Sequence, residues 1–314
     1  MHPVSKMRKR AKRSARKPNS TPLPSPQILD PQPSGTQPVI RQGREAVVYY
    51  IPVSPPSPSL PSSLTPSSYK TTISLPRHST WTSGLHFHTT HTEYLRLLRG
   101  AIFIYLDGET QILSAKAGGS VAIYGDKTAV NATPGLQVKV NKYARHNWGR
   151  ARESLSRKRI TCVVPRYPED IDDEVVVEEW TEPVDLTKPL FFWNLNAVVL
   201  TPLDARLEGR GKMAARWMLG GWWVSFQLFT IFYEQDNWPV VVGLRGVLGG
   251  ETDWPWIRRW NRQIEGAVEW CIIMIVVGFA RAVGWVLGVK AVEKERTPEG
   301  LWEGYQKNRA CKQV

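Results

Sequence analysis

The chain has 314 residues, of which 42% are hydrophobic and 22% are charged, so it is long enough for two ordinary domains. Its three cysteines are odd in number and widely scattered, which excludes a disulfide framework and a zinc knuckle. The formal net charge is +13, and no apolar segment follows the basic start, so a secretory signal is excluded as well. We therefore expect an intracellular, cytoplasmic protein.

Residues 1–66 are predicted to be a disordered head. Eight basic residues and no acidic residue lie between Lys6 and Lys17, and proline and serine interrupt the sequence that follows. Proline removes backbone donors and fixes φ, so this segment cannot build a core. The basic residues are concentrated there without interleaved aromatic residues, so we expect no nucleic-acid partner; an organellar transit peptide is the alternative. One stretch, Glu45–Val53, is predicted as an edge strand.

Residues 67–165 are predicted to form an all-β domain. Runs of β-branched and alternating apolar residues are separated by glycine-containing turns. Asp107 and Gly108 supply the positive φ that a tight turn requires, so residues 103–113 are expected to form a hairpin. Short strands at such spacing are typical of a sandwich or a barrel.

Two further regions follow the β domain. Residues 166–210 are acidic at first and are predicted to be a surface connector with one short strand. Residues 211–314 are predicted to be mainly helical, because they contain two long apolar runs, Met218–Tyr233 and Trp270–Val289. Ten of the fourteen tryptophans lie beyond Arg210. The first run is short for a membrane span and is expected to be a core or interfacial helix.

The second apolar run leaves two alternatives open. Residues 270–289 are long enough to span a bilayer, but Arg281 lies near the middle of the run. Membrane association through these residues is one alternative. The other is a buried helix that packs on the barrel or on a partner subunit, and a homodimer is one assembly consistent with it.

The stretch GLHFHTTHTEYLRLLRG, residues 84–100, contains the candidate chemistry. On a strand, His86 and His88 face the same side, because side chains alternate between the two faces. The next residues are expected to form a turn with His91 on the surface. Glu93 then shares the inward face of the following strand with apolar neighbours. Two imidazoles and a carboxylate on adjacent strands are suitable ligands for Zn, Fe, Mn or Ni.

A fourth ligand should come from elsewhere in the chain. His146 is the sole histidine after His91, and it is expected at the end of a strand over residues 136–148. The predicted metal ligands are therefore His86, His88, Glu93 and His146. No phosphate-binding glycine pattern and no nucleophile elbow occurs in the sequence.

This pattern resembles the first motif of the cupin superfamily, H-x-H-x4-E-x6-G, which falls here on His86, His88, Glu93 and Gly100. The second cupin motif, G-x5-P-x-G-x2-H-x3-N, matches at Gly135 and His146. Asn141 and Tyr143 stand in place of its proline and second glycine, and Arg150 stands in place of its asparagine. The resemblance covers residues 81–150, about a quarter of the chain.

Membership of this superfamily implies an all-β jelly-roll barrel with a divalent transition metal inside, held by the three histidines and the glutamate. It implies an enzyme with open metal positions for substrate, O₂ or water. The general layout is similar to cupin-domain proteins of fungal polyketide gene clusters. We therefore expect a metal-dependent oxidoreductase that tailors a small organic substrate, an aromatic polyketide, in secondary metabolism. The alternative is a non-catalytic cupin module tethered to a membrane or a partner by its C-terminal region.

Overall fold

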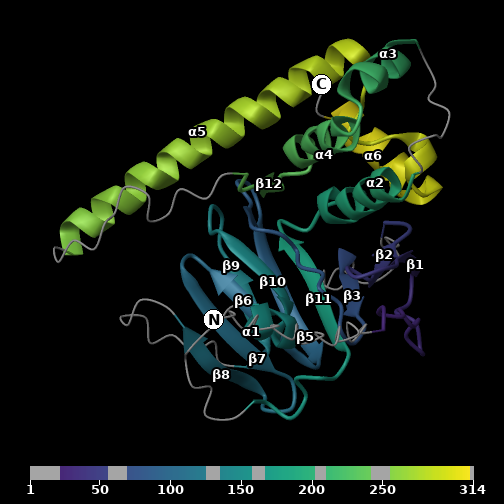
Figure 1. The fold of residues 1–314 in the computed structure, drawn as a ribbon. Coiled ribbons are helices and arrows are strands. Elements are labelled where there is room, and N and C mark those ends of the chain that lie inside the picture. The colour runs from purple at the N-terminus through teal and green to yellow at the C-terminus, as the bar shows by residue number, and fades with distance from the viewer. Residues whose placement is uncertain are drawn as a thin grey trace, which may run out of the picture.

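The computed structural model of the chain describes residues 22–55, 69–124, 135–157, 167–201, 210–241 and 255–311. Two six-stranded antiparallel sheets lie face to face, and the helices of the C-terminal region gather at one end of them (Figure 1). All strand pairs are antiparallel, as in a jelly roll.

The first sheet contains, in spatial order, β1 (Thr36–Arg41), β2 (Val47–Pro52), β3 (Thr71–Leu75), β11 (Val175–Glu182), β5 (Thr92–Arg99) and β9 (Gln137–Val140). The second contains β12 (Trp238–Pro239), β4 (His86–Phe87), β10 (His146–Arg150), β6 (Ala101–Leu106), β7 (Glu109–Ser114) and β8 (Gly119–Tyr124). Strands far apart in the sequence are neighbours in both sheets, so residues from several segments converge between them.

The predicted hairpin is confirmed. Strands β6 and β7 pair from Ala101 with Ser114 to Leu106 with Glu109, and two residues form the turn. Asp107 and Gly108 have φ values of 48° and 109°, the positive values that such a turn requires. By contrast, the single strand expected over residues 136–148 is wrong. The segment divides into β9 and β10, which belong to different sheets, and His146 begins a strand instead of ending one.

The main core lies between the two sheets. Trp148, Leu95 and Ile73 are among its fully buried side chains. Tyr49 also belongs to it, and its hydroxyl accepts a hydrogen bond of 2.9 Å from Trp81 Nε1. Buried aromatic residues with a polar atom need such a partner, so the pairing fixes both rings.

The expectation that residues 1–66 stand outside the fold is wrong for the segment that forms β1 and β2. Residues 46–51 are each exposed by 1% or less, and β2 is an inner strand between β1 and β3 instead of an edge. The uninterrupted apolar run makes this possible, because helix α2 (Thr187–Leu200) covers β2 and Trp193 Nε1 donates to Pro52 O. Residues 1–21 and 56–68 of the predicted head lie outside the described residues.

The predicted connector, residues 166–210, is also wrong as a boundary. It contains β11, which lies between β3 and β5 in the first sheet, so the barrel extends past residue 165. The acidic residues that made this segment look solvated have specific cationic partners. Glu178 pairs with Lys70 at 3.2 Å, and Glu179 pairs with Lys188 at 3.1 Å.

The C-terminal region is mainly helical in its described residues, as predicted. Its elements are α3 (Arg210–Leu219), α4 (Trp222–Glu234), α5 (Pro255–Leu287), a 3₁₀ turn (Lys294–Arg296) and α6 (Glu299–Cys311). Outside this region, the short helix α1 (Ala151–Arg157) follows β10. Within the described residues, α5 is the one helix long and apolar enough to cross a membrane, over Ile264–Leu287. It is also packed along α4.

Candidate metal centre

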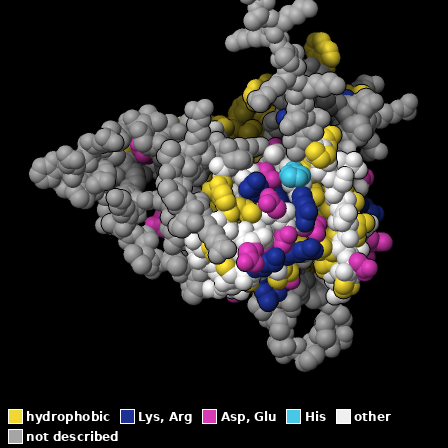
Figure 2. Space-filling view, turned by 60° about the horizontal axis from the view of Figure 1, so that its bottom comes forward, with side chains coloured by type: hydrophobic (Ala, Val, Ile, Leu, Met, Phe, Trp, Pro, Cys, Tyr) yellow, Lys and Arg dark blue, Asp and Glu magenta, His cyan; other side chains and the backbone are white. Residues whose placement is uncertain are grey.

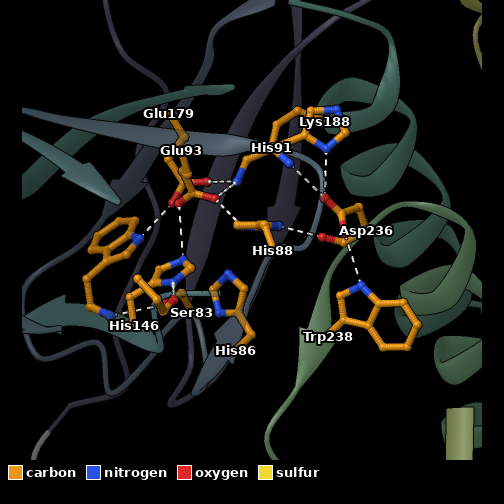
Figure 3. Close-up of polar contacts among 12 residues, drawn as sticks. Ser83, His86, His88, His91, Glu93, His146, Glu179, Lys188, Asp236 and Trp238 are labelled. Atoms are coloured by element: carbon orange, nitrogen blue, oxygen red, sulfur yellow. Dashed lines mark hydrogen bonds and ion pairs between the residues drawn. The ribbon is translucent and has the colours of Figure 1, made fainter. Parts of the chain in front are cut away.

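All four predicted ligands meet between the two sheets. His86 on β4 and His146 on β10 are cross-strand partners in the second sheet, and His88 follows β4 directly. Glu93 points toward them from β5 in the first sheet (Figure 3). One ligand atom from each residue lies within 4.8 Å of all the others. The predicted ligand set therefore forms a compact cluster.

The cluster is fully enclosed by protein. None of its four side chains belongs to a residue that is more than 6% exposed. The rings of His86 and His146 have centroids 4.0 Å apart, and His88 lies 5.2 Å and 5.3 Å from them. Burial of this many polar groups is costly unless hydrogen bonds or an ion satisfy them.

Backbone carbonyls fix the tautomer of each histidine. Nδ1 of His86 lies 2.8 Å from Gly84 O, Nδ1 of His146 lies 3.0 Å from Ala144 O, and Nδ1 of His88 lies 2.5 Å from Asp236 O. A carbonyl has no proton to give, so each Nδ1 is the donor. Each neutral ring then turns its Nε2 lone pair toward the centre, as metal-binding histidines do.

The inward-facing atoms need a cation. Nε2 of His88 lies 2.7 Å from Glu93 Oε2, and Nε2 of His146 lies 3.6 Å from Glu93 Oε1. His146 Nε2 and Glu93 Oε1 are buried, and neither has a hydrogen-bond partner among the residues that the structure describes. Lone pairs that converge in a buried space repel one another unless a proton or a metal ion lies among them. The donor set, three imidazole nitrogens and one carboxylate, fits a divalent transition metal.

A buried lysine lies on the other side of Glu93. Lys188 Nζ, from the first turn of α2, donates to Glu93 Oε2 at 2.5 Å and lies 3.1 Å from Glu179 Oε2. Glu179 also accepts a 2.6 Å hydrogen bond from Trp148 Nε1. The Lys188 ammonium therefore binds Oε2 of Glu93, and Oε1 of Glu93 remains the oxygen that faces His146.

Burial and neighbouring charges set the protonation state of His86 and His88. Burial, together with the neighbouring imidazoles, lowers the pKa of His86 well below its usual value. Burial also lowers the pKa of His88, although the hydrogen bond and charge of Glu93 oppose it. Both rings are therefore neutral at physiological pH, the state in which imidazole binds metal.

Glu93 and Lys188 keep their charges because each stabilises the charged form of the other. Burial by itself raises the pKa of Glu93, but the charge of the Lys188 ammonium and the neighbouring His146 and His88 outweigh it and hold that pKa well below the usual range. Burial likewise lowers the pKa of Lys188, but Glu179 and Glu93 outweigh it and raise that pKa. Burial and the charge of Glu93 raise the pKa of Glu179 against the opposing effect of Lys188. Glu93 is thus ionised beside a protonated lysine.

The turn before His146 explains one departure from the cupin pattern. Tyr143, which stands where the second motif has its second glycine, has a φ of 64°. This left-handed conformation is the one that glycine adopts most easily. The backbone N–H of Tyr143 donates a hydrogen bond to His88 O at 2.6 Å, so this turn supports the backbone at His88.

The sheets and the enclosed ligands together decide the architecture. The barrel is of the cupin type. The resemblance predicted from the motif is confirmed, and the cupin barrel carries its ligand residues on β4, β5 and β10 and directly after β4.

No protein-family model matches the sequence, and no curated protein matches it. Among solved structures, KdgF from Halomonas sp. is 13% identical over 46% of this chain and 86% of KdgF, with a TM-score of 0.25. The Drosophila melanogaster CENP-C cupin domain is 9% identical over 46% of this chain and 76% of that domain, with a TM-score of 0.24. At such scores these likenesses carry no argument about activity.

A third solved structure is that of CapF, the capsular polysaccharide assembling protein from Staphylococcus aureus. It is 12% identical over 48% of this chain, with a TM-score of 0.25. The chain covers 31% of CapF, about a third of its length. The cupin assignment therefore rests on the strand order and ligand cluster of this chain.

The expectation that His91 is a surface residue is wrong. Its Nδ1 lies 2.8 Å from Asp236 Oδ2 and its Nε2 lies 3.0 Å from Asp185 Oδ2, and the residue is buried. Burial by itself lowers the pKa of His91, but the hydrogen bonds and charges of Asp185 and Asp236 outweigh it and raise that pKa to about 9. His91 is buried against Asp236, a residue that is distant in the sequence and that no local pattern connects with His91.

The sequence analysis missed Lys188, Glu179 and Asp236. Glu179 had a usable signal, because it continues the inward alternation of Val175 and Val177 on β11, as Glu93 does on β5. Asp236 and Lys188 had none. Their roles depend on the docking of α2 and of the segment after α4 against the barrel, which no local pattern reveals.

Proposed function

We propose that this chain is a metal-dependent cupin enzyme that binds one divalent transition metal through His86, His88, His146 and Glu93. The observation that carries the proposal is the convergence of three Nε2 atoms and one carboxylate in a buried space, with His146 Nε2 and Glu93 Oε1 lacking hydrogen-bond partners. Native proteins rarely leave such groups unsatisfied. A metal ion satisfies all of them at once.

The residues around the ligands have defined tasks. Gly84, Ala144 and Asp236 hold the three imidazoles through their carbonyls, and Lys188 holds the second oxygen of Glu93. Such outer hydrogen bonds fix ring orientation and raise the basicity of the ligands. When bound, the metal supplies Lewis acidity or redox chemistry to a substrate oxygen or to O₂.

The finer assignment is an oxidoreductase that tailors a small organic substrate, with an aromatic polyketide as the proposed class. It is supported by the ligand set, which leaves metal positions for O₂ and substrate, and by the layout of a single barrel with an aromatic C-terminal region. Oxygen consumption by the iron-loaded protein, measured over a panel of reduced phenolic aromatics, tests this assignment. Uptake that is absent with every member of the panel would contradict it.

Metal analysis of the purified, reconstituted protein tests the site itself. We expect about one metal per chain, and we expect His86→Ala, His88→Ala and His146→Ala each to lose most of it, because each removes one of four donors. His78→Asn is the matched control: it removes an exposed histidine, and asparagine tolerates its φ of 65°. An unmodified protein that stays metal-free after incubation with Fe, Mn, Zn and Ni would sink the metal proposal.

A second candidate is a non-catalytic cupin module, and one observation favours it. The Lys188 ammonium already pairs with Glu93, so the carboxylate has a cation without any metal. The two candidates differ in the open metal positions. Cobalt-substituted protein that changes its visible spectrum on addition of azide supports the enzyme, whereas an unchanged spectrum supports the closed module.

A further inference from the structure

Helix α5 turns apolar side chains away from the protein. Its exposed residues recur at intervals of three and four along one face, which we name the outer stripe: Ile264, Val268, Cys271, Ile275, Phe279, Ala282 and Val286. Ile275 and Phe279 are exposed by 70% and 69%. The stripe is about 33 Å long, from 1.5 Å per residue. Within it, no charged residue occurs.

The two acidic residues of the same segment face inward, and its arginine is paired. Glu265 and Glu269 are both buried, and Glu269 forms an ion pair with Arg145 between β9 and β10. Arg281 pairs with Glu234 of α4 at 2.9 Å. The inward face of α5 is also apolar at Ile273, Val277 and Ala280, so the helix carries apolar side chains on both of its faces. A helix of this length with a second, exposed apolar face needs an apolar environment on its outside.

Exposed tryptophans flank the outer stripe, and basic residues precede and follow it in the sequence. Trp285 is exposed by 76%, and Trp217 of α3, which lies at the C-terminal end of α5 (Figure 1), is exposed by 87%. In the sequence, Arg258, Arg259 and Arg262 precede the stripe and the exposed Lys290 follows it. Tryptophan prefers the boundary between lipid and water, and basic flanks attract anionic headgroups.

The other side of the molecule has a different character. Figure 2, which brings the lower side of Figure 1 forward, shows basic and acidic side chains intermixed there. Ion pairs such as Arg99–Glu174 and Lys116–Asp173 belong to this kind of surface. Mixed charge of both signs is typical of a surface that faces water. The apolar outer stripe is therefore not a general property of the surface.

We propose that the outer stripe, with Trp217 and Trp285, binds the surface of an anionic lipid bilayer, and that α5 lies parallel to the membrane plane. The in-plane orientation follows from the two ion pairs, which tie α5 to the barrel and to α4. A helix that crossed the bilayer alone would take Glu265, Glu269 and Arg281 into hydrocarbon without these partners, which is strongly unfavourable. The metal centre then sits in the barrel on the aqueous side.

Flotation of the full chain with lipid vesicles tests the proposal. We expect flotation with vesicles of phosphatidylcholine and phosphatidylserine, and weaker flotation with phosphatidylcholine alone. Ile275→Glu/Phe279→Glu should lower vesicle partition by about tenfold or more, because two carboxylates replace inserted apolar groups. Leu98→Glu is the matched control, since it places an acid at an exposed apolar position on β5. A double variant that floats like the unmodified protein, or an unmodified protein that floats with neither vesicle, would overturn the proposal.

Cys271 lies on the outer stripe and reports on its occupant. A variant with Cys271 as its single thiol is labelled with an environment-sensitive fluorophore, and a variant that keeps the exposed Cys311 of α6 is the control. We expect a blue shift on addition of vesicles at Cys271 and none at Cys311. If oxidation instead links two chains through Cys271 and vesicles cause no shift, the occupant is a second copy of this chain, and the lipid proposal is wrong.

Discussion

At the scale of single residues, Lys188 controls the charge of the metal centre. Its ammonium lies among two buried carboxylates, and it is the cation that Glu93 and Glu179 share. Removing one member of a buried ion pair leaves an uncompensated charge in a medium that solvates it poorly. Lys188 is therefore expected to contribute most to the stability of the fold when no metal is bound.

Lys188→Met is expected to lower the free energy of unfolding of the metal-free protein by about 3–5 kcal/mol, because it leaves both carboxylates without their cation. Adding Glu179→Gln should recover part of this loss, since one of the two unpaired charges is then removed. Chemical denaturation of the chelator-treated variants measures both effects. A loss within experimental error for Lys188→Met would contradict the charge network.

His91 predicts a pH dependence of stability. Its pKa is raised from 6.5 to about 9 in the folded state, because the pull of Asp185 and Asp236 exceeds the effect of burial. A group whose folded pKa is raised contributes stability that is complete below its unfolded pKa and is lost as pH rises through the folded pKa. The free energy of unfolding should therefore fall between pH 6.5 and pH 9, by about 3 kcal/mol at most at 1.36 kcal/mol per pKa unit.

The same measurement on His91→Gln provides the control, because glutamine keeps polar contacts but does not titrate in this range. The decline should flatten in the variant, and chelator in both samples removes the contribution of metal binding. Equal slopes for the two proteins would assign the pH dependence to another group. Asp236 has the opposite sign: its pKa is held below the usual range, so its contribution is lost as pH falls.

At the scale of elements, Gly100 explains why the first cupin motif ends in glycine. The residue connects β5 and β6 with a φ of 75°, and a Cβ there would lie 2.5 Å from Glu174 O and 3.0 Å from Val175 Cγ2. The approach of β11, which follows Glu174, thus leaves no room for a side chain. A glycine that the motif identifies locally is required by a strand distant in the sequence.

Gly100→Ala is expected to destabilise the protein by about 3 kcal/mol, since backbone strain of about 1–3 kcal/mol adds to a collision with backbone that cannot move freely. Gly118→Ala is the matched control, because its φ of 72° carries the strain but its Cβ would meet nothing within 4 Å. Thermal denaturation should show the larger loss at Gly100. Equal losses would mean that β11 yields to the added methyl group.

At the scale of the whole molecule, the C-terminal region helps to build the metal centre. Asp236, which follows α4, accepts hydrogen bonds from Thr89, Thr90 and His91 through its carboxylate, and its backbone oxygen accepts from His88. Nearby, Phe87 packs with Trp238 and with Ile273 and Val277 of α5. The residues on both sides of Phe87, His86 and His88, are proposed metal ligands, so the helical region and the site form one unit.

Asp236→Ala is expected to weaken metal binding about tenfold, because loss of the carboxylate releases the turn that orients His88. Asp172→Ala is the matched control, since this exposed aspartate forms an ion pair with the exposed Arg152, away from the four candidate ligands. Competition with a chromophoric chelator measures the affinity of each variant. Metal affinity unchanged by Asp236→Ala would show that the barrel orients His88 without the C-terminal region.

The sequence by itself determined the four candidate ligands that meet in the buried cluster, the β6–β7 hairpin and the helical character of the C-terminal region. These features depend on short-range rules: alternation on a strand placed Glu93 inward, Asp-Gly favoured a tight turn, and long apolar runs favoured helices. Fixed offsets between His86, His88 and Glu93 were enough to indicate shared chemistry before any strand order was known.

Only the tertiary structure decided the extent of the barrel and the charge of its centre. Composition predicted an edge strand where β2 lies and a short strand of a surface connector where β11 lies, yet both are inner strands, because pairing partners and covering helices come from distant segments. The same distance hid Lys188 and Asp236, which lie 95 and 143 positions beyond Glu93 in the sequence. Long-range packing brings these groups together, and it is the low dielectric of the resulting interior that makes their charges decisive.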